Sequence, residues 1–294
     1  MKVSKTWMRR FAIAAALIAA PAFFFLTFDS FISGGDAPAS RPVLVETLVR
    51  TQKPVRAVIR GAGERMRGTG DGPAATVAAP LPAPPRPTPP AELVVPILAY
   101  HNVREAAGKT PPAKRPYDVT PAEIEVQFAY LEAEGFTAIS PDDIVAAFDG
   151  SSALPAKPIL ITFDDGRDTQ FMKAYPVLVR HGLVATFYIF TNAIDRPGYF
   201  TWGQLKELRD AGMTIGSHTI IHPFLTMADD AELHRQLTVS KAMLEEGLGK
   251  PVTAFAHPFG LYDDRTVAAV RAAGYATARG LDHRVRMSKE DLLA

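Results

Sequence analysis

The sequence predicts an α/β fold in which a parallel sheet is flanked by helices. Short apolar runs typical of buried strands alternate along the chain with longer amphipathic stretches typical of helices. Several of the helical stretches open on Thr, Ser or Asp with Pro in the first turn, a common start signal. Strand and helix in alternation require connections that cross the sheet, and these give parallel strands with helices outside.

The predicted elements follow one another from residue 93 onward. Strands are expected at residues 94–100, 159–163, 184–190, 213–217, 252–256 and 275–278. Helices are expected at residues 121–134, 141–148, 169–180, 202–211, 230–247 and 263–273. The absence of internal repeats and the domain-sized length predict that residues 93–294 form one folded unit.

Residues 33–92 have no convincing core, and residues 73–90 are dominated by Pro and Ala. Such a composition favours an extended, semi-rigid and disordered linker. The linker is preceded by residues 1–32, in which basic side chains come before the apolar stretch 11–28. This order is typical of a signal peptide, and the stretch is also just long enough for a signal anchor. We therefore expect export to the periplasm or the cell exterior, with the inner membrane as a partner if the segment is kept.

Composition excludes several other functions. The 294 residues carry a formal net charge of +1, so nothing suggests nucleic acid as a partner. The chain has no cysteine, which excludes disulfides, zinc–thiolate sites and a cysteine nucleophile.

Two short motifs about fifty residues apart carry the candidate chemistry. The first is Thr-Phe-Asp-Asp-Gly at 162–166, directly after a buried strand, and the second is His-Thr-Ile-Ile-His-Pro at 218–223. Catalytic groups gather where the strands of α/β sheets end. Two imidazole nitrogens and one carboxylate oxygen suit zinc or a similar divalent metal, and the second carboxylate is then free to act as a base.

These motifs resemble those of the polysaccharide deacetylase family, also called the NodB homology domain or carbohydrate esterase family 4. The similarity covers roughly residues 94–280. It implies a distorted, incomplete (β/α) barrel with its site at the carboxyl ends of the strands. It also implies that Asp164 is the catalytic base and that Asp165, His218 and His222 hold a divalent metal. Zinc is expected first, with cobalt, nickel or iron as alternatives.

The family's third motif differs in this chain. Residues 255–260 read Phe-Ala-His-Pro-Phe-Gly, so Ala256 stands where the family usually has an Arg that orients the catalytic Asp. This version resembles that of extracellular poly-N-acetylglucosamine deacetylases. The resemblance makes His257 a candidate general acid, although it can equally pack beneath the site. The Leu-Asp-His sequence ending at His283 matches the family's acid motif, but it follows the last strand closely and is not favoured.

The resemblance also implies a set of substrate contacts and a substrate class. The expected contacts are Tyr100, His101, Trp202, Pro258 and Phe259. The expected activity is metal-dependent removal of acetyl groups from an N-acetylglucosamine polymer of the envelope or cell exterior. The alternatives are a peptidoglycan or chitooligosaccharide deacetylase and a polysaccharide-binding module without turnover. A metallopeptidase is disfavoured because the chain has no His-Glu-x-x-His.

Overall fold

A computed structural model of the chain describes residues 88–105, 117–281 and 285–294. The predicted signal segment, most of the predicted linker and His283 lie outside the described residues. Among the helices of the described residues, none is both long enough and apolar enough to cross a membrane.

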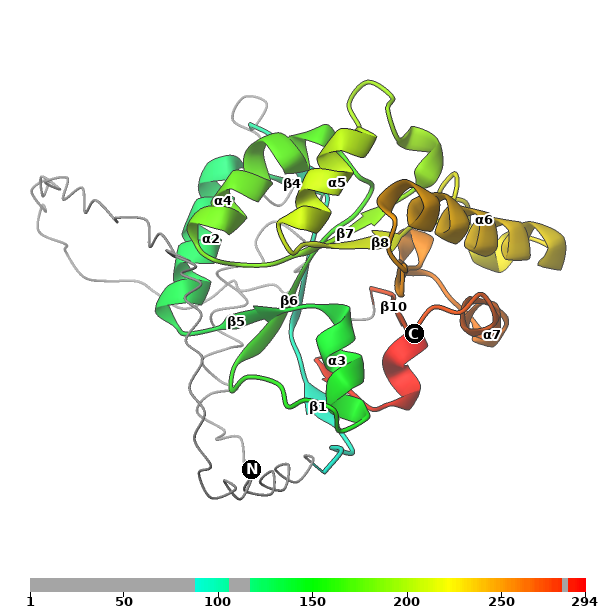
Figure 1. The fold of residues 1–294 in the computed structure, drawn as a ribbon, viewed down its shortest axis with the longest axis horizontal. Coiled ribbons are helices and arrows are strands. Elements are labelled where there is room, and N and C mark those ends of the chain that lie inside the picture. Colours follow the sequence, from blue (N-terminus) through cyan, green and yellow to red (C-terminus); the bar gives the residue numbers. More distant parts are fainter. Residues whose placement is uncertain (1–87, 106–116, 282–284) are drawn as a thin grey trace, which may run out of the picture. The chain divides into compact units, whose positions relative to one another are not determined.

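A curled parallel sheet forms the centre of the fold (Figure 1). Its order is β10-β9-β8-β7-β6-β2, and β5 also pairs with β6; every pair is parallel. The strands are β2 (Ile97–Tyr100), β5 (Thr137–Ile139), β6 (Pro158–Phe163), β7 (Thr186–Ile189), β8 (Thr214–Ser217), β9 (Ala254–Ala256) and β10 (Thr277–Arg279). The predicted α/β class and parallel sheet are confirmed. β5 was not predicted, because three residues carry too little periodic signal.

The helices lie outside the sheet, and α2, α4 and α5 run along its upper side in Figure 1. Their bounds are α2 (Pro121–Ala133), α3 (Pro141–Phe148), α4 (Tyr175–Arg180), α5 (Trp202–Asp210), α6 (Asp230–Leu248) and α7 (Asp264–Ala272). Thr120, Ser140, Thr201 and Asp263 each cap a helix with reciprocal side-chain and backbone hydrogen bonds, so the start signals were interpreted correctly. The helix expected at 169–180 is divided into a π-helical turn, η2 (Gln170–Ala174), and α4.

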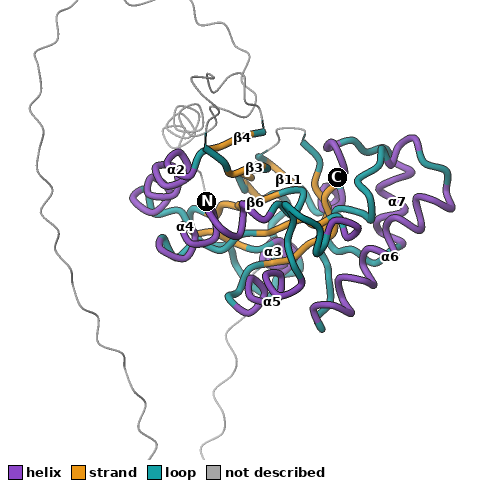
Figure 2. Tube along the Cα trace, turned by 90° about the horizontal axis from the view of Figure 1, so that it is seen from above, coloured by secondary structure: helices purple, strands orange, loops and turns teal. Residues whose placement is uncertain are grey.

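Short segments complete the domain. β1 (Leu93–Val94) pairs antiparallel with β11 (Arg286–Met287), and β3 (Asn102–Val103) pairs parallel with β4 (Asp118–Val119). The single turns are η3 (Thr191–Ala193), η4 (Leu225–Met227), η5 (Pro258–Gly260) and η6 (Glu290–Leu293). Figure 2 shows β11 and the carboxyl end on the same side of the domain as β3. These pieces are too short to be predicted from periodicity.

The core explains why β6 reads as an unbroken apolar run. Every residue of β6 is buried, because helices cover one face of the sheet and the curled sheet encloses the other. Phe163 stacks on Tyr100 on one side and on Phe187 on the other, with ring centroids 5.1 and 5.0 Å apart. The strand is therefore fixed up to its last residue, and the residues that follow it start from a rigid support.

Candidate active site and metal centre

The two sequence motifs meet at the carboxyl edge of the sheet. Asp164 and Asp165 come directly after β6, and His218 comes directly after β8. Only β7 separates these two parallel strands, so their ends point to the same edge. His222 returns toward this edge through the loop that follows β8, and its ring centroid lies 4.6 Å from that of His218.

Three side chains converge on a common point. Oδ1 of Asp165 lies 4.0 Å from Nε2 of His218 and 3.7 Å from Nε2 of His222. All three potential ligand atoms lie within 4.8 Å of one another. Two imidazole nitrogens and one carboxylate oxygen form a donor set suited to zinc and similar divalent ions, with positions left for other ligands. The residues present therefore fit the expected metal.

The protonation state of His218 also suits a metal ligand. Its Nδ1 lies 2.7 Å from the backbone oxygen of Ala256. Because a carbonyl can only accept, the proton sits on Nδ1 and the lone pair of Nε2 faces Asp165. Burial lowers the pKa of His218 to about 4, and burial also lowers the pKa of His222. Both rings are thus neutral at neutral pH, which is the form that binds a metal.

The backbone around these residues adopts an unusual conformation. Among the described residues, five that are not glycine have positive φ, and four of them belong to the three motif segments. The four are Asp165 (73°), Thr219 (74°), His222 (58°) and Phe259 (59°). Such conformations cost roughly 1–3 kcal/mol each and persist where surrounding contacts enforce them. One such contact is the hydrogen bond from the backbone N–H of His222 to Oγ1 of Thr219, at 2.9 Å.

Asp164 lies beside the three converging residues but has different partners. It is 3 % exposed, and its Oδ1 accepts a hydrogen bond from Nη2 of Arg279. Its Oδ2 lies 3.6 Å from Nε2 of His101. Burial alone would raise the pKa of Asp164, but the charges of Arg279, His101 and His218 outweigh it and lower the pKa to about 2. The side chain is therefore a carboxylate at neutral pH.

The backbone of Asp164 is held by Gln170, at the start of the π-helical turn η2. Nε2 of this fully buried side chain donates to the backbone oxygens of both His101 and Asp164. π-helical turns occur often at functional sites. Gln170 could not be predicted as a site residue, because a single Gln in an amphipathic segment carries no signal of this role.

Arg279 is a second site residue that was not predicted from the sequence. The predicted last strand stopped at Ala278, whereas β10 extends to Arg279. The sequence does show a charged residue at the end of an otherwise uncharged strand, where active-site groups gather.

His257 does not join this cluster. Its ring is 2 % exposed and packs against Phe255 and Tyr262, with centroids 5.2 Å away in each case. Its Nε2 lies 3.3 Å from the backbone oxygen of Leu293, and burial lowers the pKa of the ring to about 4. Of the two interpretations offered for His257, these contacts support packing beneath the site.

The predicted substrate contacts divide into two groups. His101 faces Asp164, and Phe259 is 46 % exposed with its ring 4.5 Å from that of His222. Pro258 is buried in η5 between His257 and Phe259.

The other two predicted contacts, Tyr100 and Trp202, both pack against the hydrophobic core. Tyr100 is buried in the core, where its hydroxyl donates to Oε1 of Gln127 at 2.6 Å. Trp202 packs between α5 and α6, so closely that a Cβ on Gly247 would collide with its ring.

Comparison with known proteins agrees with this arrangement. Residues 151–278 match the family model described as polysaccharide deacetylase. A peptidoglycan-N-acetylglucosamine deacetylase of Bacillus cereus is 30 % identical over 122 residues, covering 41 % of this chain and 55 % of that protein. A poly-beta-1,6-N-acetyl-D-glucosamine N-deacetylase of Escherichia coli is 28 % identical over 138 residues, covering 42 % of this chain and 20 % of that protein.

A solved structure shares the fold. The Streptococcus pyogenes deacetylase PplD, in complex with acetate, matches with a TM-score of 0.59 and 26 % identity. The match covers 68 % of this chain and 96 % of that structure. Among the first curated relatives, this chain spans at most 62 % of their own length.

Proposed function

We propose that the chain removes acetyl groups from N-acetylglucosamine units of an exported polysaccharide in a metal-dependent reaction, in keeping with the polysaccharide deacetylase model that its residues 151–278 match. One observation carries this proposal: Asp165, His218 and His222 converge with ligand atoms within 4.8 Å, and Asp164 lies beside them as a separate carboxylate. A metal site with an adjacent free base suits hydrolysis of an amide.

The roles of the residues follow from their surroundings. A divalent metal held by Asp165, His218 and His222 would polarise the acetamide carbonyl and lower the pKa of a bound water. Asp164 is ionised and accepts the proton of the attacking water. The amine that leaves the acetyl group needs a proton in turn, and we assign its delivery to His101. This ring lies 3.6 Å from Asp164, is partly exposed and packs against Tyr117. The products are acetate and a glucosamine unit.

We propose a β-1,6-linked N-acetylglucosamine polymer as the preferred substrate. The Ala-His-Pro-Phe-Gly version of the third motif and the similarity to a deacetylase of that polymer support this choice. Peptidoglycan is the second candidate, because a relative named for it is similar over 122 residues. The predicted amino-terminal export segment would bring the domain to either polymer in the periplasm or outside the cell, with zinc as the first metal to test.

Acetate release from a panel of glycans tests the proposal. The panel holds poly-β-1,6-N-acetylglucosamine, peptidoglycan and chitooligosaccharides, and the full chain is assayed after chelation and after reloading with zinc or cobalt. We expect release only from the reloaded protein, and fastest from the first polymer. Binding of a glycan without acetate release by any reloaded form would instead support a binding module.

A pair of histidine variants locates the metal. His222→Ala should lose bound metal and activity together, because it removes one of three ligands. His234→Ala is the matched control, since His234 is exposed on α6. Equal metal content in the two variants would place the metal elsewhere.

A further inference from the structure

We propose that Arg279 holds Asp164 in position. It would thus take the role of the family's usual Arg, whose place at position 256 on the neighbouring strand is occupied by Ala256 in this chain. The inference rests on the proposed function, in which Asp164 is the base. β9 and β10 are parallel neighbours, and Arg279 is the direct register partner of Ala256. In the related family the Arg stands at the position of Ala256. Arg279 lies one strand away from that position and at the same height along the sheet.

The contact between Arg279 and Asp164 has the form that positioning requires. Nη2 of Arg279 donates to Oδ1 of Asp164, and the two side chains are 7 % and 5 % exposed. Because Oδ1 is held in this way, Oδ2 is the oxygen left facing His101 at 3.6 Å. The guanidinium thus determines which carboxylate oxygen is available for proton transfer.

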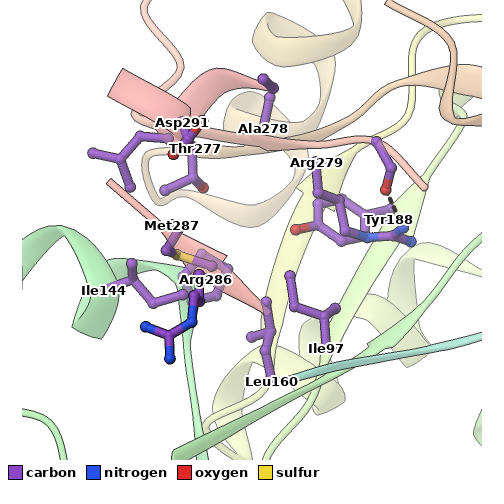
Figure 3. A pocket seen from close by; sticks show the side chains of 14 residues that line it. Ile97, Ile144, Leu160, Tyr188, Thr277, Ala278, Arg279, Arg286, Met287 and Asp291 are labelled. Carbon is purple, nitrogen blue, oxygen red and sulfur yellow. Dashed lines mark hydrogen bonds between the residues drawn. The ribbon is translucent and has the colours of Figure 1, made fainter. Parts of the chain in front are cut away.

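Arg279 is itself held in a single orientation. Its guanidinium lies over the Tyr188 ring, with the central carbon 5.1 Å from the ring centroid (Figure 3). Nη1 lies 3.4 Å from the backbone oxygen of Gly280. Among the described residues, Asp164 is the only carboxylate that pairs with Arg279. The small side chain of Ala256 packs beside Tyr188 in the same cluster, which leaves room for the guanidinium from the next strand.

A cavity borders Arg279, Tyr188 and Gly280. Ile97 and Leu160 lie on its wall near Arg279 and Tyr188, as Figure 3 shows. Nε of Arg279 is buried and has no hydrogen-bond partner in the described part of the chain. The two terminal nitrogens of this side chain carry its contacts with Gly280 and Asp164.

Stability alone does not explain a buried pair of this kind. Replacing a buried ion pair with apolar residues is often neutral or stabilising, because desolvation offsets the attraction. Catalysis, by contrast, requires a base that is held within about half an ångström of its productive place. A positioning role and a structural role predict different kinetics, so they can be separated by experiment.

The first test is Arg279→Met in the metal-loaded full chain, assayed on the best substrate of the panel. We expect kcat to fall by about 10²-fold, with KM changed less than about threefold and with metal content unchanged. Arg271→Met is the matched control, because Arg271 is exposed on α7, and its kcat should equal that of the unmodified protein. An unchanged kcat in Arg279→Met would overturn the inference, as would a loss explained entirely by unfolded or metal-free protein.

The second test moves the guanidinium to the neighbouring strand. Arg279→Ala should be as slow as Arg279→Met, and the double variant Arg279→Ala with Ala256→Arg should recover at least about tenfold in kcat. Added guanidinium ion should also accelerate Arg279→Ala but not Arg271→Ala. If neither restores kcat although the single variant folds and binds metal, the role assigned to the guanidinium is wrong.

A structural measurement separates this inference from the proposed function. If the unmodified protein releases acetate from no glycan, the proposed function fails, and the crystal structure of Arg279→Met still decides the role of Arg279. A rotated or disordered Asp164 carboxylate beside unchanged Asp165, His218 and His222 supports the inference. An Asp164 in its original orientation overturns it.

Discussion

Asp164 and Asp165 are neighbours in the sequence but occupy different chemical environments. The left-handed backbone of Asp165, with φ of 73°, turns the chain between them. Asp164 consequently points to Arg279 and His101, whereas Asp165 points to the two histidines. One carboxylate is thus paired with a guanidinium, and the other is free to join neutral imidazoles around a metal. Neutral imidazoles with a carboxylate are the combination that divalent metals prefer.

The two amide variants of this pair should have different consequences. Asp164→Asn keeps the shape but cannot accept a proton, so we expect kcat to fall by about 10²-fold or more with metal content unchanged. Asp165→Asn keeps a residue type that tolerates positive φ, yet it removes the ligand charge, so metal content should fall with activity. Elemental analysis measures the metal content of the two variants, and acetate release measures their kcat. Loss of metal from Asp164→Asn alone would show that the two roles are reversed.

The position of His101 leads to a second prediction at the residue scale. If His101 supplies the proton to the leaving amine, His101→Gln should lower kcat by about 10²-fold with substrate affinity retained. His257→Phe should keep most of the activity, because its ring packs between Phe255 and Tyr262 and a Phe fills the same space. Steady-state kinetics on one substrate compares the two. A larger loss of kcat in His257→Phe would restore His257 as the general acid.

These residues show what could be predicted from the sequence. Asp164, Asp165, His218 and His222 stand in contiguous motifs, so their proximity could be expected from two short segments alone. The contact of Arg279 with Asp164 spans 115 positions and depends on the register of β10 against β9. No local pattern contains that register. The same holds for His101, whose approach to Asp164 depends on the pairing of β2 with β6.

At the scale of the elements, the predicted helix at 169–180 differs most from the structure. Pro176 has no N–H to donate to the preceding turn, so the regular helical ladder cannot run through it. The chain instead forms the π-helical turn η2 before α4, and Gln170 at its start reaches the backbone of Asp164. Pro176 is visible in the sequence, but the sequence does not show that the preceding turn becomes π-helical.

The contact between α2 and α4 predicts a pH dependence of stability. His181, at the end of α4, binds Glu132 through Nδ1 at 2.7 Å and Glu125 through Nε2 at 2.9 Å. The hydrogen bond to Glu132, together with that to Glu125, raises the pKa of His181 in the folded state against the opposing effect of burial. The stabilisation is therefore complete below the unfolded value of about 6.5 and is lost as pH rises through the higher folded value.

Thermal unfolding as a function of pH measures this effect. Relative to His181→Gln, the unmodified protein should have its largest advantage in Tm near about pH 6 and lose that advantage by about pH 9. The difference should be small, because both glutamates are largely exposed and solvent weakens such pairs. High salt should reduce it further. An advantage that instead grows with pH would show that His181 is neutral in the folded protein.

At the scale of the whole domain, residues 285–294 connect the two ends of the described fold. β11 pairs with β1, and η6 packs on β10. Arg286, Met287, Asp291, Leu292 and Ala294 also line the cavity next to Arg279. The last strand predicted from the sequence ended at Ala278. In the structure β11 and η6 cover this part of the sheet, although both are too short to give a periodic pattern.

Leu293 tests whether this covering segment belongs to the cooperative core. Its side chain is 6 % exposed, and its backbone oxygen lies 3.3 Å from Nε2 of His257. Leu293→Ala should lower the free energy of unfolding by about 2–5 kcal/mol, because it removes buried methyl groups and leaves a cavity. Leu261→Ala is the matched control, because Leu261 is 49 % exposed and should change stability by less than about 0.5 kcal/mol. Urea unfolding of the metal-loaded proteins gives both values. If the two variants are equally stable, the segment packs too loosely to support β10, and the position of Arg279 must depend on Asp164, Tyr188 and Gly280 without its help.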